Sequence, residues 1–102
     1  MCRVVTTEGD NTSSGPDLAD AIPAAIARRR LSPVEYLDAL RARFDALEPR
    51  LNTTVRPLWD EAREDAKKAA RRIARSGPRS PLDGLPVGLK DIIDLKGHPT
   101  TC

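Results

Sequence analysis

The residue with the clearest chemical potential is Lys90, in the segment PLDGLPVGLKD at residues 81–91. Gly88 stands between Val87 and Leu89, so apolar and small residues alternate before Lys90. A lysine in such surroundings can be desolvated, and desolvation favours the neutral amine. A neutral amine can take up a proton near neutral pH. Lys90 is therefore the candidate catalytic residue, with the role of a base.

Other site chemistries are poorly supported by the residues present. The glycines before Lys90 lack the spacing of a phosphate loop and the Ser or Thr that follows its lysine. One histidine and two distant cysteines cannot build a zinc site, so we expect no metal and no cofactor, and His98 is expected to face solvent in a turn. Asp91 and Asp94 are three residues apart, and turn contacts are a more common use of such aspartates than paired catalytic carboxylates.

Composition limits the broad class of protein. A chain of 102 residues with 3% aromatic residues makes at most one small domain with a thin core. The net charge of +2 is spread along the chain, which argues against nucleic acid or an anionic membrane as a partner. No apolar run approaches the ~20 residues that cross a bilayer. Cys2 and Cys102 form no disulfide framework and no signal peptide is visible, so we expect a cytoplasmic location.

Two helices are predicted in the first half of the chain. The first runs from Asp20, with Pro23 tolerated in its first turn and three arginines (residues 28–30) at its solvated C-terminal end. The second begins at Ser32, which starts a capping box closed by Glu35, and stops at Pro49. Its apolar residues recur at spacings of three and four and predict a face for core or partner contact: Val34, Leu37, Leu40, Phe44 and Leu47.

A third helix is predicted from about Leu58 or Asp60 to Ser76, where Gly77-Pro78 ends it. Its acidic residues precede its basic ones, which suits the helix dipole. Short strands are expected at residues 51–55 and 86–92, from β-branched content and from alternation respectively. The fold class is therefore α/β, with three helices and one or two short strands. Residues 1–17 are expected to form a disordered tail.

Together with GHPTT at residues 97–101, the segment at 81–91 resembles the part of the amidase signature family that carries the catalytic lysine. In that family the lysine segment reads Pro-Leu-x-Gly-aliphatic-Pro-aliphatic-x-aliphatic-Lys-Asp, and a Gly-x-Pro-Thr-Thr turn follows at the same spacing. The order of helices upstream also agrees. The resemblance covers about residues 18–102 and implies a partial amidase domain whose elements join a large mixed sheet.

The resemblance implies a hydrolase that cleaves the C–N bond of a carboxylic amide through a Ser-cisSer-Lys triad. In this chain that role falls on Lys90 alone. Its serines all precede Lys90, and none matches the family's two catalytic serines: Ser13, Ser14, Ser32, Ser76 and Ser80. The chain by itself is therefore predicted to be inactive, and the implied partner is a small-molecule amide bound by the complete enzyme.

Alternatives remain open at this point. Within the same class, the segment also suits the glutaminase subunit of a tRNA-dependent amidotransferase. Outside it, the chain could be a non-catalytic truncated fragment, or a helical module that binds a protein through its apolar stripe. In each case we expect marginal stability and association through exposed apolar helix faces.

Overall fold

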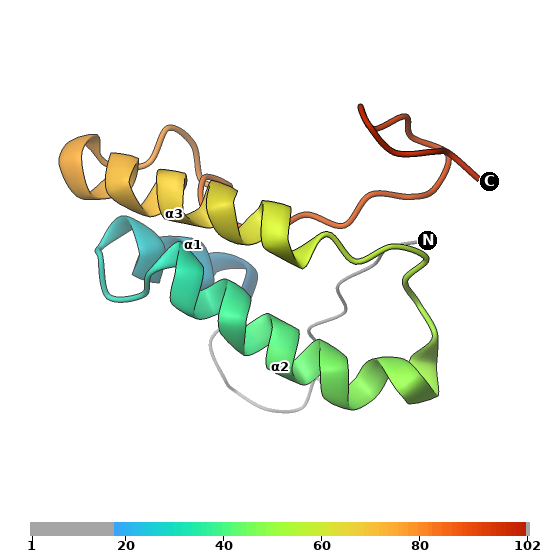
Figure 1. Cartoon of the computed structure of the whole chain (residues 1–102). Coiled ribbons are helices and arrows are strands. Elements are labelled where there is room, and N and C mark those ends of the chain that lie inside the picture. Colours follow the sequence, from blue (N-terminus) through green and yellow to red (C-terminus); the bar gives the residue numbers. More distant parts are fainter. Residues whose placement is uncertain (1–17, 102) are drawn as a thin grey trace.

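The structure, a computed structural model, describes residues 18–101. The predicted tail at residues 1–17 and the last residue, Cys102, lie outside the described residues. Three helices form in chain order: α1 (Leu18–Ala27), α2 (Pro33–Leu51) and α3 (Trp59–Ser76) (Figure 1). They confirm the predicted helices. Within the described part of the chain, no helix has both the length and the apolar content needed to cross a membrane.

The start of α2 is fixed by local hydrogen bonds, as predicted. The Ser32 hydroxyl accepts a hydrogen bond from the backbone N–H of Val34 at 3.2 Å, and the Ser32 N–H donates to Glu35 Oε2 at 3.1 Å. Pro33 takes the first helical position, where a missing N–H costs nothing. This capping box satisfies backbone donors that the first turn would otherwise leave unpaired.

Two predicted boundaries were wrong. Helix α2 continues past Pro49 to Leu51, because a proline near the end removes only one backbone bond and Asn52 then closes the helix. Asn52 adopts the left-handed conformation (φ 48°), and its N–H donates to Glu48 O at 2.7 Å. Helix α1 begins at Leu18 rather than Asp20, so Pro23 lies inside the helix and not in its first turn.

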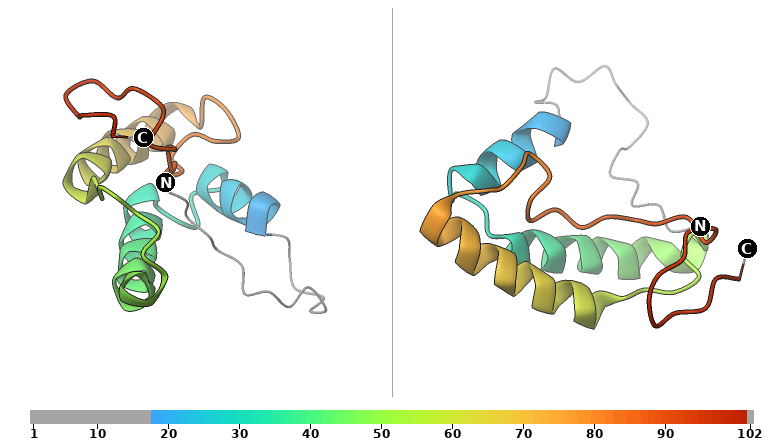
Figure 2. Two further views of the ribbon diagram at one scale, coloured as in Figure 1. Left: turned by 90° about the vertical axis from the view of Figure 1, so that its right-hand side faces the viewer. Right: turned by 90° about the horizontal axis from the view of Figure 1, so that it is seen from above.

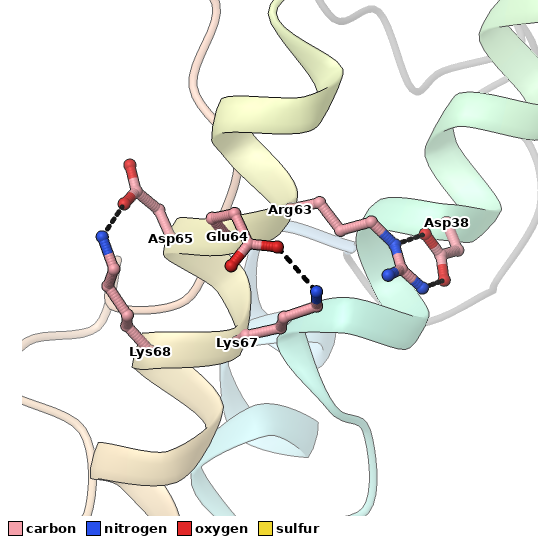
Figure 3. Close-up of polar contacts among 6 residues, drawn as sticks. All are labelled: Asp38, Arg63, Glu64, Asp65, Lys67 and Lys68. Carbon is pink, nitrogen blue, oxygen red and sulfur yellow. Dashed lines mark hydrogen bonds and ion pairs between the residues drawn. The ribbon is translucent and has the colours of Figure 1, made fainter.

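Helix α3 has the predicted bounds and ends at Gly77, whose φ is 76°. Its charges pair along the exposed surface at a spacing of three residues. Lys67 Nζ lies 2.6 Å from Glu64 Oε1, and Lys68 Nζ lies 3.2 Å from Asp65 Oδ1 (Figure 3). These two pairs use four of the ten charged residues of α3 within the helix itself.

Helices α2 and α3 lie side by side and run antiparallel, joined by residues 52–58 (Figures 1 and 2). An ion pair and an aromatic contact are among the interactions that hold them together. The guanidinium of Arg63 binds both carboxylate oxygens of Asp38, at 3.2 Å each (Figure 3). The Phe44 ring of α2 meets Trp59 edge to face, with ring centroids 5.1 Å apart. Of the predicted apolar stripe of α2, Leu37 is buried and the other four residues are partly buried.

A small core lies where α1 and the C-terminal half of α3 meet. Ile26, Ala69 and Ile73 are buried there. Ile22, Leu31 and Leu85 pack against them as partly buried neighbours. Leu85 belongs to the segment that leads to Lys90, so this segment starts on the core.

The two predicted strands do not form in the described part of the chain, so the fold seen there is helical. Residues 51–55 divide between the end of α2 and a connector, and residues 86–92 have no strand partner. A strand must exchange backbone hydrogen bonds with a neighbour, whereas a helix satisfies its own. Residues 86–101 instead run back toward the start of α3 as an irregular segment (Figures 1 and 2). Its one bridge is antiparallel, between Leu95 and His98.

Candidate active site around Lys90

Lys90 lies at a groove between the start of α3 and the irregular C-terminal segment. The groove has a volume of about 210 Å³ and mostly apolar walls. Phe44 and Trp59 line it from the helices, and Val87, Leu89 and Lys90 line it from the other side. A concave apolar surface with a few polar groups is the usual form of a small-molecule site. The predicted catalytic lysine is thus on the wall of a surface of this kind.

The side chain of Lys90 is exposed. It makes no hydrogen bond or ion pair with other residues of the described range, while its carbonyl accepts a bond from the Ile93 N–H at 3.0 Å. The desolvation that the sequence pattern suggested is therefore not provided by residues 18–101. Any base chemistry at Lys90 needs further protein to cover the groove and remove water from the amine.

Beyond Lys90 the chain closes into a loop. Asp91 accepts hydrogen bonds from the N–H of Thr101, at 3.2 Å, and from its hydroxyl. Asp94 accepts one from the Thr100 hydroxyl at 2.7 Å. The Thr101 hydroxyl, followed by its N–H, lowers the pKa of Asp91. Both aspartates thus make turn contacts, as predicted, and do not form a paired-carboxylate site.

The prediction that His98 faces solvent was wrong. Its side chain is 23% exposed, and its Nε2 lies 3.3 Å from Glu61 Oε2 on α3. The interaction joins residues 37 positions apart, so local sequence could not reveal it. Among the described residues, no group of three or more His, Cys, Asp or Glu side chains could hold a metal ion.

The segment before Lys90 is held on the helices by Asp83, a residue that the sequence analysis did not single out. Asp83 forms an ion pair with Arg72 of α3, and its second oxygen accepts the Arg79 N–H at 2.9 Å. That N–H bond, more than the neighbouring Arg72 charge, lowers the pKa of Asp83. The sequence signal that could have pointed to Asp83 was the Asp-Gly dipeptide at 83–84, which is typical of a tight turn.

The serines of the described range serve backbone structure. Ser32 caps α2, Ser76 is the last residue of α3, and the Ser80 hydroxyl accepts the Leu82 N–H at 3.3 Å. Ser13 and Ser14 lie outside the described residues. Nothing in the described range pairs a serine with Lys90.

Comparison with known proteins identifies the family to which the chain belongs. The family model described as Amidase matches residues 35–102, which include the whole segment from Pro81 to Thr101. The chain therefore belongs to the amidase family. No solved structure matches it.

Matches to individual relatives are more specific than the match to the family model. The chain is 44% identical over 77 residues to the A subunit of the glutamyl-tRNA(Gln) amidotransferase from Geobacter metallireducens. It is 46% identical over 77 residues to the protein of the same name from Geobacter sulfurreducens, and 38% over 81 residues to that of Chloroflexus aggregans. These matches cover 76% to 79% of this chain but only 16% to 17% of each relative.

Proposed function

We propose that residues 18–102 are the lysine-bearing part of an enzyme that cleaves carboxylic amide C–N bonds, with Lys90 as its base. The observation that carries this proposal is the family match, which includes the full lysine segment and the turn after it. In the proposed reaction a serine attacks the amide carbonyl, the C–N bond breaks and ammonia or an amine leaves, and water then hydrolyses the acyl-serine to release the acid. Lys90 takes the serine's proton through a bridging serine, and the substrate is a small amide in the cytoplasm.

The proposal assigns no turnover to these 102 residues alone. Acyl transfer needs a nucleophile and donors for the oxyanion as well as a base. The serines that precede Lys90 serve as caps or turns or lie outside the described residues, and the groove leaves Lys90 open to water. Lys90 would become an effective base only where further protein covers the groove and supplies the nucleophile.

A second candidate is the glutaminase subunit of a tRNA-dependent amidotransferase. It is favoured by the names of the relatives, since the two Geobacter proteins and the Chloroflexus protein are each the A subunit of a glutamyl-tRNA(Gln) amidotransferase. In that case the amide is that of glutamine, and the ammonia released passes to an acceptor on tRNA. Both candidates give Lys90 the same role.

The test is a chimera in which residues 18–102 replace the matching segment of the Geobacter metallireducens relative. Glutamine hydrolysis is then measured for the chimera, for Lys90→Ala and for Lys96→Ala, a lysine in the following turn. Loss of a general base lowers the rate by about 10²–10⁴-fold, so Lys90→Ala should show that loss and Lys96→Ala should keep nearly full activity. Equal activity of the two variants would refute the role given to Lys90.

The non-catalytic alternatives are separated by a different measurement. An antibody against residues 60–76 captures the protein from its own cells, and mass spectrometry gives its intact mass. A species several times heavier than 11.1 kDa supports the enzyme proposal. A species at 11.1 kDa supports a separate small protein that binds a partner through its apolar surface.

A further inference from the structure

The chain between α3 and Lys90 has one well-fixed point, at residues 83–85. The side chain of Asp83 is 10% exposed and that of its partner Arg72 is 26% exposed, so water reaches little of this ion pair. The Asp83 carboxylate also accepts the Arg79 N–H, and the Asp83 N–H donates to Ser80 O at 3.1 Å. A largely buried residue with three such contacts allows its loop little freedom.

Gly84 brings the same loop into close contact with the helices. A Cβ at this position would lie 2.9 Å from Pro33 Cγ and 3.3 Å from Ile73 Cδ1. The backbone of the connector therefore touches both the start of α2 and the core face of α3. The next residue, Leu85, packs against the core cluster of Ile26, Ala69 and Ile73.

This contact ends abruptly beyond Leu85. Val87 is 72% exposed and Leu89 is 39% exposed, and Lys90 is exposed as well. Beyond Lys90, the bond between Asp91 and Thr101 joins the segment to its own loop, and in that loop His98 Nε2 lies 3.3 Å from Glu61 Oε2 on α3. Residues 83–85 are therefore the last place before Lys90 where the chain is held by the helices.

We propose that Arg72 and Asp83 are positioning residues for Lys90. Together with the close approach at Gly84 they fix where the lysine segment leaves the helices, and so where Lys90 meets the groove. Neither residue touches reacting atoms. The importance of this role for catalysis rests on the proposed function, whereas the anchoring itself does not.

The test compares Asp83→Ala and Arg72→Met with Asp38→Ala, which removes the interhelical ion pair Arg63–Asp38 (Figure 3). Amide hydrogen exchange is measured on the 102-residue protein at Leu85, whose N–H donates to Leu82 O, and at Ala69 in the core of α3. Both anchor variants should lower Leu85 protection about tenfold and leave Ala69 within about twofold. Asp38→Ala should leave Leu85 unchanged.

Equal loss at Leu85 and Ala69 would overturn the proposal, because the pair would then support the whole fold rather than the segment. An unprotected Leu85 amide in the unmodified chain would overturn it as well. In the chimera, the anchor variants should lower kcat about tenfold and change KM little, since a displaced base slows the chemical step and not binding. Faster exchange at Leu85 with an unchanged kcat would overturn the catalytic part of this inference. An inactive Lys96→Ala chimera or an active Lys90→Ala chimera would instead count against the proposed function.

Discussion

A single methyl group at Gly84 should test how tightly the connector is pressed on the helices. The φ angle of Gly84 is +85°, a conformation that costs about 1–2 kcal/mol for a residue with a side chain. The added Cβ would also lie 2.9 Å from Pro33 Cγ, and overpacking of this kind costs about 1–3 kcal/mol. Gly84→Ala should therefore lower the free energy of unfolding by about 2–5 kcal/mol.

The two costs can be separated in a double-mutant cycle with Pro33→Ala. Removing the proline ring relieves the contact but not the strain in φ, so Gly84→Ala should cost about 1–2 kcal/mol less in the Pro33→Ala background. Urea unfolding followed by circular dichroism gives all four free energies. A loss that is the same in both backgrounds would refute the contact, and with it the view that the connector is pressed against α2.

Three other residues give predictions that can be checked on the same protein. Lys90→Ala should change the unfolding free energy by less than about 0.5 kcal/mol in urea titrations, because the side chain is exposed and has no bond within the described range. Ser32→Ala should cost about 1 kcal/mol by the same method, through loss of the α2 cap, whereas Ser80→Ala should cost less. Asp83 has a folded pKa below its ordinary value of 3.8, so its stabilisation is present above that value and is lost as pH falls through the lowered one. Leu85 amide protection should fall in that acid range, and Asp83→Ala should weaken this pH dependence, while carboxylates such as Glu48 and Asp91, whose pKa values are also lowered, keep the remainder.

The helices were predictable because their determinants are close together in the sequence. Ser32 and Glu35 form the capping box within four residues, and Gly77 ends α3 directly after its last residue. The end of α2 was predicted less well, because a proline rule ignores the stabilisation that Asn52 adds in its left-handed conformation. Local rules therefore gave the number and type of helices, and erred where two local signals competed.

The features around the candidate site depend on contacts between distant residues. Arg72 and Asp83 are 11 positions apart, and Glu61 and His98 are 37 apart. These four residues are of the same types as many others on this chain, since 31% of its residues are charged. Only the arrangement of α3 against the returning segment reveals which of these charges hold it in place.

The strand predicted at residues 86–92 and the base function predicted for Lys90 both require a neighbouring protein surface. Alternation at residues 86–92 predicts a strand, but a strand needs a neighbour to accept its backbone hydrogen bonds, and the described residues offer none. The same open side leaves Val87, Ile92 and Ile93 at least half exposed and leaves Lys90 in water. A protein surface that added a strand beside residues 86–92 and packed on the face that carries Lys90 and Ile92 would bury that isoleucine and desolvate the amine together. Strand formation and base function at Lys90 should therefore appear together, because each depends on the same covering surface.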